Sequence, residues 1–210
     1  GTQGATRGAS CSHAPGSRGA AVNIIPLVNL PEGSRGPWTI RHFTVSRDSL
    51  QNFKNGMVGR DTAPGTYTQL VHAQRGVIMS DTDAERRDHQ EFIHRADGHV
   101  LINGLGLGMC LGAILKKSTV TRATVVEIDQ DVIDLVGPHY LGDPRVEIAK
   151  ASAFDYQPPK GVRYGAVWHD IWDNLCTDNL PQMTRLKRKY GRRCDWQGCW
   201  GEWFIRRRMR

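Results

Sequence analysis

An apolar segment that runs directly into three closely spaced glycines constrains the fold of this chain most. Residues Val100–Gly108 read VLINGLGLG, and a segment with helical spacing of apolar residues follows from Met109 to Lys117. Glycines at the end of a strand let the backbone turn tightly and approach a ligand closely, and the start of a helix adds unpaired N–H groups. This segment therefore predicts a strand, a ligand-binding loop and a helix in succession.

The next apolar segment carries an acid at its end. Glu127 lies 23 residues after Gly104, within the sequence TVVEID. An acid at the end of the second strand can accept hydrogen bonds from both ribose hydroxyls of an adenosine nucleoside. The glycine spacing is Gly-x-Gly-x-Gly rather than the Gly-x-Gly-x-x-Gly of dinucleotide sites, so it favours a nucleoside with an amino-acid tail over a pyrophosphate.

Apolar periodicity predicts the remaining elements. Strands are expected at residues 21–30, 39–45, 67–72, 76–79, 99–103, 123–128, 145–149 and 164–169, and helices at 83–95, 109–117, 130–136, 179–190 and within 195–208. Ser80 or Asp81 is the expected N-cap of the helix at 83–95. Strands that alternate with helices imply a parallel sheet, so the predicted fold class is α/β with a Rossmann-like sheet. After Trp172 the chain has too little apolar strand material for a full sheet, which predicts truncation at the C-terminal end.

The domain boundaries follow from these elements. We expect a flexible leader at 1–20, a β-rich N-terminal arm and helix at 21–95, a Rossmann-like nucleoside-binding domain at 96–176, and a basic, Trp-rich helical tail at 177–210.

Charge and composition limit the partners. The net charge is +7, and residues 185–210 hold ten Lys and Arg against two acids, so the excess is local to the tail. Such a tail fits either a nucleic-acid contact or a solvated surface.

No apolar run approaches the roughly 18 residues of a membrane helix. The five cysteines form no Cys-x-x-Cys pair, so no metal site is expected, and free thiols in a cytoplasmic protein are the simpler interpretation.

The stretch from Tyr67 to Asp170 resembles the spermidine synthase-like branch of the class I S-adenosylmethionine-dependent methyltransferases. The likeness rests on the order and spacing of YTQLVHAQRGVIMSDT, AERRDHQEFIHRA, VLINGLGLG, VVEIDQDVIDLV, DPRVEIAKASAFDY and VWHDIW. It covers about half of the chain. The resemblance implies a Rossmann-like methyltransferase sheet, with S-adenosylmethionine or its decarboxylated form as the cofactor.

The resemblance also implies roles for single residues. The expected cofactor-binding residues are Asn103, Gly104, Gly106, Gly108, Glu127, Ser152 and Ala153. Asp170 stands where aminopropyltransferases carry the acid that helps to deprotonate the attacking amine. The sequence departs from the family in two places, because the glycine loop lacks the acid of true spermidine synthases and the acid expected beside the adenine is missing at Ser152.

Asp170 ends the fourth strand of the predicted parallel sheet, at the edge where ligands bind in open α/β folds, and is the expected catalytic base. His169 titrates near neutrality, but strand alternation would place it on the opposite face. Weaker candidates for the substrate site are Tyr67, Gln69, Asp81, Glu85, His89 and Trp172. The stripe of Trp196, Trp200 and Trp203 is expected to serve as core or as an oligomer contact.

Three functions stay open at this point. The first is S-adenosylmethionine-dependent methyl transfer to an unidentified acceptor, and the second is aminopropyl transfer to a polyamine. The third is a non-catalytic nucleoside-binding protein with a basic docking tail. A small-molecule acceptor is the expected partner, with nucleic acid and a second copy of the chain as open alternatives.

Overall fold

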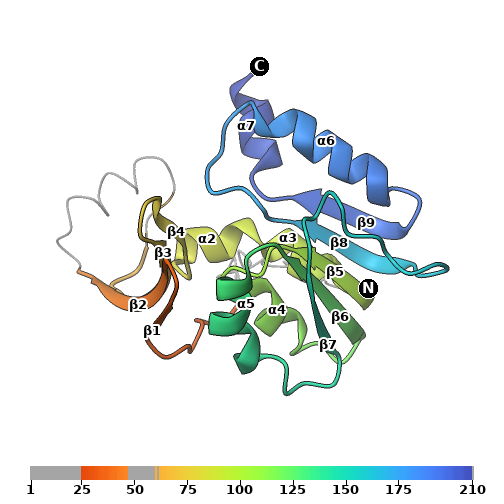
Figure 1. Cartoon of the computed structure of the whole chain (residues 1–210). Helices are drawn as coiled ribbons and strands as arrows, with labels where there is room; N and C mark the ends of the chain where they lie inside the picture. Colours follow the sequence, from red (N-terminus) through yellow and green to blue (C-terminus); the bar gives the residue numbers. More distant parts are fainter. Residues whose placement is uncertain (1–24, 47–59, 61, 210) are drawn as a thin grey trace, which may run out of the picture.

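The computed structural model describes residues 25–46, 60 and 62–209. The chain forms two sheets, a four-stranded antiparallel sheet near the N-terminus and a five-stranded parallel sheet that follows it (Figure 1). The predicted leader at 1–20 lies outside the described residues.

The antiparallel sheet has the order β1-β2-β3-β4. Its strands are β1 (Gly33–Arg35), β2 (Trp38–Val45), β3 (Gly65–His72) and β4 (Gly76–Ser80). The strands predicted at 39–45, 67–72 and 76–79 are confirmed. The edge strand predicted at 21–30 is wrong for its described part, where residues 25–30 form no strand. Pro26 lacks an N–H, and the Val28 N–H donates to the Asp81 carboxylate instead of to a neighbouring strand.

The helix predicted at 83–95 is divided at His89 into α2 (Asp83–Asp88) and α3 (Gln90–Arg95). The N-cap is Thr82 rather than Ser80 or Asp81. The physical reason is that the Asp81 carboxylate is already occupied by the N–H groups of Val28 and Thr68. The break at His89 matters for function because it directs this imidazole into the interior.

The parallel sheet has the order β7-β6-β5-β8-β9. Its strands are β5 (Gly98–Asn103), β6 (Val120–Glu127), β7 (Val146–Lys150), β8 (Tyr164–His169) and β9 (Cys194–Cys199). The helices that accompany them are α4 (Met109–Ile114), α5 (Gln130–Val136), the short 3-10 helix η1 (Gly137–His139), α6 (Asn179–Tyr190) and α7 (Glu202–Arg208). All four strand pairs are parallel, which confirms the α/β Rossmann-like class.

The strand β9 corrects two predictions about the C-terminal region. The single helix expected within 195–208 is wrong, because its first part is β9 and only α7 is helical. The sheet therefore has a fifth strand where a helix was expected, whereas no further strand follows β9 in the described residues. The spacing of the tryptophans suggested a helix. Trp196 instead lies on β9 and stacks on Trp168 of β8, with 6.2 Å between the ring centroids.

Two hydrophobic layers cover the faces of the parallel sheet. Val100 and Ile102 of β5 face a core that includes residues of α3, α4 and α5, whereas Leu101 faces Leu186 and Tyr190 of α6. Figure 1 shows α6 and α4 on opposite sides of the strands. The described part of the chain holds no helix with the length and apolar character that a membrane crossing requires. The two layers leave the carboxyl ends of the strands as the edge where a site can form.

Candidate functional site

A cavity of about 750 Å³ opens at the carboxyl ends of β5, β6 and β8. The chain order of the strands reverses between β5 and β8, because β6 and β7 lie on one side of β5 and β8 and β9 on the other. Ligands of open α/β sheets bind at such a reversal point, outside the carboxyl ends of the strands. The cavity also has a size typical of small-molecule sites.

The glycine loop forms one wall of this cavity through Gly104 and Gly106. Gly104 has φ +100°, and a Cβ there would lie 2.0 Å from the carbonyl oxygen of Asp170. Gly106 has φ +49°, and a Cβ there would lie 2.2 Å from the Met79 Sδ. Glycine is therefore required at both positions for the backbone conformation and for the close approach of neighbouring atoms.

Glu127 lines the cavity from the end of β6 and is 8% exposed. Its Oε2 accepts a hydrogen bond from the Leu105 N–H at 2.8 Å, and its Oε1 accepts one from the Asp129 N–H at 2.9 Å. Burial raises the pKa of this carboxyl above its usual value, while these backbone hydrogen bonds oppose the shift. The two bonds fix the carboxylate, and each oxygen keeps a second lone pair for a ligand hydroxyl.

Ser152 and Ala153, which the sequence predicts to bind a cofactor, line the same cavity as Glu127. The Ser152 hydroxyl accepts a hydrogen bond from the Phe154 N–H at 3.2 Å, which closes a turn after β7. This turn forms the cavity wall together with Ile128, an apolar side chain that is 67% exposed. A flat, apolar base fits such a wall.

Asp170 follows β8 directly and lines the cavity next to the start of the glycine loop at Gly104. Its N–H donates to the Asn103 carbonyl at 2.9 Å, which continues the pairing of β8 with β5. Burial, followed by the negative charges of Glu85 and Asp88, raises the pKa of Asp170 to about 7. An acid with this pKa can accept or release a proton near neutrality, as general base catalysis requires.

Glu85 and His89 line the same part of the cavity as Asp170. The His89 Nε2 lies 3.8 Å from the Asp170 Oδ2, and burial lowers the pKa of His89 to about 4, so this ring is neutral. The Glu85 carboxylate accepts hydrogen bonds from the Ser80 N–H and hydroxyl at 2.8 and 2.7 Å. These two weaker candidates therefore lie with Asp170, although they precede it by more than 80 residues.

Asn103 differs from its prediction, because its side chain does not line the cavity. It is fully buried on the opposite face, where its Nδ2 lies 2.8 Å from the His169 Nδ1. His169 packs against the Tyr190 ring of α6 at 5.4 Å between centroids, and burial lowers its pKa to about 4. Strand alternation causes both placements, since the neighbouring residues Asp170 and Gly104 face the cavity.

Gly108 also lies outside the cavity lining. A Cβ at this position would lie 2.3 Å from the Tyr140 ring, and the Tyr140 hydroxyl donates to the Leu107 carbonyl at 3.0 Å. The absence of a side chain at Gly108 therefore lets the Tyr140 ring pack against the loop on the side away from the cavity lining.

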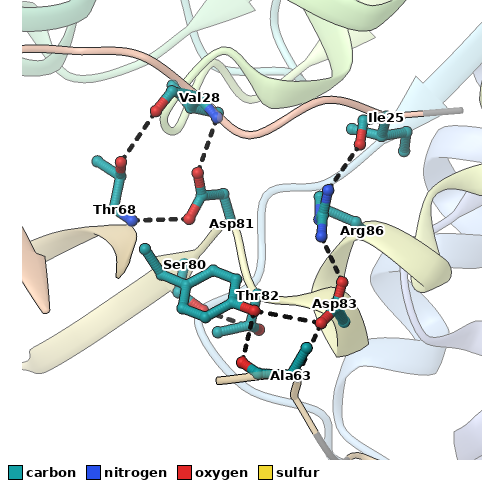
Figure 2. Close-up of polar contacts among 10 residues, drawn as sticks. Ile25, Val28, Ala63, Thr68, Ser80, Asp81, Thr82, Asp83 and Arg86 are labelled. Atoms are coloured by element: carbon teal, nitrogen blue, oxygen red, sulfur yellow. Dashed lines mark hydrogen bonds and ion pairs between the residues drawn. The ribbon is translucent and has the colours of Figure 1, made fainter. Parts of the chain in front are cut away.

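The three remaining candidates in the N-terminal arm, Tyr67, Gln69 and Asp81, do not line the cavity. Asp81 is fully buried and joins two segments by accepting hydrogen bonds from the N–H groups of Thr68 and Val28, both at 2.7 Å (Figure 2). The Tyr67 hydroxyl donates to the Ala63 carbonyl at 2.7 Å. Gln69 lies within β3 and pairs with Arg41 and Ser80. These residues hold the arm together rather than face a ligand.

Trp172 lines the cavity, as predicted, and its Nε1–H donates to the Gln182 side chain at 2.8 Å. Sequence reasoning missed several other lining residues, namely Trp38, Arg60, Met79, Trp200 and Phe204. Trp200 was expected to be core or an oligomer contact, and only the position of β9 brings it to the cavity. Met79 lies in the stretch YTQLVHAQRGVIMSDT, but the other residues lie in no recognisable motif, so no signal in the sequence alone identifies them.

Comparison with known proteins supports a relationship to one group of enzymes. No family model matches the chain. A polyamine aminopropyltransferase of Pyrobaculum aerophilum is 32% identical over 45% of this chain and 38% of its own length. One from Aeropyrum pernix is 24% identical over 66% of this chain and 51% of its own length. The chain thus spans about a third to a half of the length of these curated relatives.

Solved structures with partial likeness include the spermidine synthase of Thermotoga maritima, which is 23% identical over 49% of this chain and 42% of its own, with a TM-score of 0.35. The N-methyltransferase NodS of Bradyrhizobium japonicum is 11% identical over 54% of this chain and 59% of its own, with a TM-score of 0.42. The sequence of the chain is thus similar to polyamine aminopropyltransferases over about half of its length, and its parallel sheet has the strand order of a Rossmann-like α/β fold.

Proposed function

We propose that the chain binds an adenosyl sulfonium nucleoside in this cavity and transfers an alkyl group from it to an amine, with aminopropyl transfer from decarboxylated S-adenosylmethionine as the favoured reaction. The observation that carries the proposal is the position of Asp170. This acid, whose side chain is 22% exposed, lines one cavity with Gly104, Gly106 and Glu127, and desolvation by its surroundings raises its pKa to about 7.

The nucleoside end of the cavity fits the adenosine part. Glu127 offers a fixed carboxylate to the ribose hydroxyls, and the glycine loop borders the same cavity through Gly104 and Gly106. The turn at Ser152 and Ala153 lies where the base would pack. This fit supports a nucleoside rather than a dinucleotide.

The charge of the lining supports a cationic donor without a carboxylate. The described lining residues include Glu85, Glu127, Asp170 and Asp173 but only one Lys or Arg, Arg60. That guanidinium already lies 3.0 Å from the Asp88 carboxylate. A donor carboxylate would find excess negative charge and no unpaired cation, whereas a sulfonium and an ammonium would both be favoured.

The residues of the chain then act on the acceptor amine. The sulfonium supplies an electrophilic carbon, whose bond to sulfur breaks as the amine nitrogen bonds to it, and the electron pair leaves with the neutral thioether. Asp170 accepts the proton that the ammonium group must lose to become a nucleophile, and this proton later passes to solvent. Exclusion of water by the apolar lining keeps the amine near this carboxylate and strengthens their interaction.

Methyl transfer is the second candidate. The observation in its favour is the composition of the glycine loop. The loop has Asn103 and Leu105 beside its first glycine and contains no acid that could bind the ammonium of an aminopropyl group. A methyltransferase would retain the carboxylate of S-adenosylmethionine, so the two reactions differ in the donor that they require.

Calorimetry with S-adenosylmethionine, its decarboxylated form and S-adenosylhomocysteine tests these proposals on the full chain. We expect at least tenfold tighter binding of the decarboxylated donor, and alkylated amine as the product when an amine is added. Tighter binding of S-adenosylmethionine would favour methyl transfer. Binding without turnover on any amine would favour a non-catalytic nucleoside-binding protein.

A further inference from the structure

The cavity continues beyond the nucleoside-binding residues to a wall that β9 and α7 build. The Trp200 N–H donates to the His169 carbonyl at 2.9 Å, which extends the pairing of β9 with β8 by one residue. Trp200 therefore stands beside Asp170 at the edge of the sheet. Phe204 and Ile205, one turn further along, line the same cavity.

This wall is fixed by packing rather than by a loop. Gly201 has φ +67°, and a Cβ there would lie 2.2 Å from the Leu175 side chain, so the chain turns sharply from β9 into α7. Ile205 is 4% exposed and packs with Met183 of α6 and Cys199 of β9. The aromatic wall thus has a defined position relative to Asp170.

The acidic groups near this wall are already occupied. The Asp88 carboxylate accepts two hydrogen bonds from Arg60, at 3.0 and 3.3 Å, and another from Trp200. Asp173 is held by Arg75, with 2.5 Å between the Arg75 nitrogen and the carboxylate oxygen. Asp170 forms no ion pair with a Lys or Arg of the described residues, and the neighbouring Glu85 is held only by the neutral N–H and hydroxyl of Ser80. Burial, followed by the charges of Glu85 and Asp88, raises the pKa of Asp170, and a hydrogen bond from Trp168 opposes the shift.

The aromatic end also carries a positive charge. The Arg60 guanidinium carbon lies 5.9 Å from the centroid of the Phe204 ring, within the range of a cation–π contact. A second ammonium placed at this end would compete with Arg60, which already holds the Asp88 carboxylate and lies over the face of Phe204. The cavity therefore offers a position for one cation, at Asp170, and next to it an apolar wall.

We infer that the acceptor is an amine with a single ammonium group and an apolar or aromatic body, rather than a diamine. The ammonium lies at Asp170, and the body packs against Trp200, Phe204 and Ile205. This inference rests on the proposed function, because it assigns the acceptor of the same reaction. It differs from the substrate class in the names of the relatives, whose sequences the chain matches over only part of its length.

The test compares 2-phenylethylamine with 1,4-diaminobutane as acceptors, with decarboxylated S-adenosylmethionine as the donor. We expect kcat/KM to be at least about tenfold higher for 2-phenylethylamine, since burial of an aromatic body in an apolar pocket contributes discrimination of this order or more. Binding of both amines to the complex of the protein with 5′-methylthioadenosine, measured by calorimetry, gives the same comparison without turnover.

Three variants and a matched control locate the preference. Phe204→Ala is expected to lower the preference for 2-phenylethylamine about tenfold, and Phe204→Leu to restore part of it. Trp203→Ala removes the neighbouring aromatic side chain, which is 56% exposed and lies outside the cavity lining, and is expected to leave the preference unchanged. Arg60→Gln should improve 1,4-diaminobutane as an acceptor.

A higher kcat/KM and tighter binding for 1,4-diaminobutane would overturn the inference, and so would equal effects of Phe204→Ala and Trp203→Ala. Failure of the proposed function has a different signature. In that case the nucleosides do not bind, or they bind and no amine is alkylated, while selective binding of 2-phenylethylamine to the nucleoside complex would still support the aromatic wall.

Discussion

The two ends of the cavity are built in different ways. The end that we propose for the nucleoside, the nucleoside end, comes from short segments at the tips of β5, β6 and β7, which contribute the glycine loop, Glu127 and the turn at Ser152. The end that we propose for the amine, the acceptor end, combines α2, the segment after β8, and α7, which lie far apart in the sequence. Contiguous segments impose their geometry through local backbone conformation, whereas the acceptor end depends on how three packed elements meet.

Substitutions at the two ends should therefore affect different properties of the protein. At the nucleoside end, a substitution that alters the backbone conformation or the fixed carboxylate should change donor affinity. At the acceptor end, a substitution should change turnover or acceptor choice and leave donor affinity intact. The following predictions can contradict or sharpen this division, from the largest expected effect to the smallest.

Asp170→Asn should have the largest effect. The amide keeps the size of the side chain but cannot accept the proton from the amine, so kcat should fall by about 10²- to 10⁴-fold while nucleoside affinity changes less than about threefold. Steady-state kinetics and calorimetry measure the two quantities. Asp173→Asn is the control, since this acid lies three residues away and is paired with Arg75. Full activity of Asp170→Asn would exclude this residue as the base.

Gly106→Val should abolish most nucleoside binding, with a loss of about 100-fold or more. The residue has φ +49°, which a β-branched residue rarely adopts, and the new side chain would displace the Met79 thioether into the cavity. Calorimetry measures the affinity, and circular dichroism checks that the fold is retained. Unchanged affinity in a folded variant would remove the glycine loop from the site.

Glu127→Ala should weaken nucleoside binding by about 1–3 kcal/mol, since charge-assisted hydrogen bonds to the ribose are lost. The effect on kcat at saturating donor should be small, which distinguishes this acid from Asp170. Glu147→Ala on the neighbouring strand β7 is a control, because that acid pairs with Arg122 and lies outside the cavity lining. Equal affinities of the Glu127 and Glu147 variants would show that the nucleoside lies elsewhere.

The pH dependence of stability should reveal the buried acid at the acceptor end. The pKa of Asp170 is raised from 3.8 to about 7 in the folded protein, so between these values the folded state binds the proton and the unfolded state has lost it. The stability that this proton provides is complete below about pH 4 and is lost as the pH rises through about 7.

Urea unfolding at pH 5 and pH 8 should therefore show a contribution of about 2–3 kcal/mol from Asp170 that favours the lower pH. In Asp170→Asn this contribution should disappear, which makes the variant relatively more stable at pH 8. The same slope in both proteins would mean that Asp170 titrates normally. Activity should change in the opposite direction and rise with pH through about 7, since the base must be deprotonated.

The basic surface of α7 should matter least. Arg206 pairs with Glu202 one turn earlier at 2.9 Å, and such exposed pairs contribute about 0.5 kcal/mol or less. Arg206→Gln should therefore leave donor affinity and acceptor choice unchanged. If the basic C-terminal segment binds nucleic acid, an oligonucleotide should instead be retained in a salt-dependent manner, and this variant should flatten the salt dependence.

The sequence by itself determined the nucleoside end of this protein. The glycine loop and Glu127 were predicted together because their geometry arises within two βα units, where glycine conformation and strand alternation act over a few residues. The same local rules predicted that Asp170 ends a strand and that His169 faces away from it. The α/β class and most strands followed from apolar periodicity for the same reason.

Only the tertiary structure decided the acceptor end. The spacing of the C-terminal tryptophans fits either a helix or a strand followed by a turn. Pairing of β9 with β8 selects the strand, because this pairing buries Cys194 and Cys199 and stacks Trp196 on Trp168. The break at His89, which directs its ring toward Asp170, likewise has no signal in local propensity. Contacts between segments 80 or more residues apart depend on the packing of the whole core, and periodicity within one segment cannot specify them.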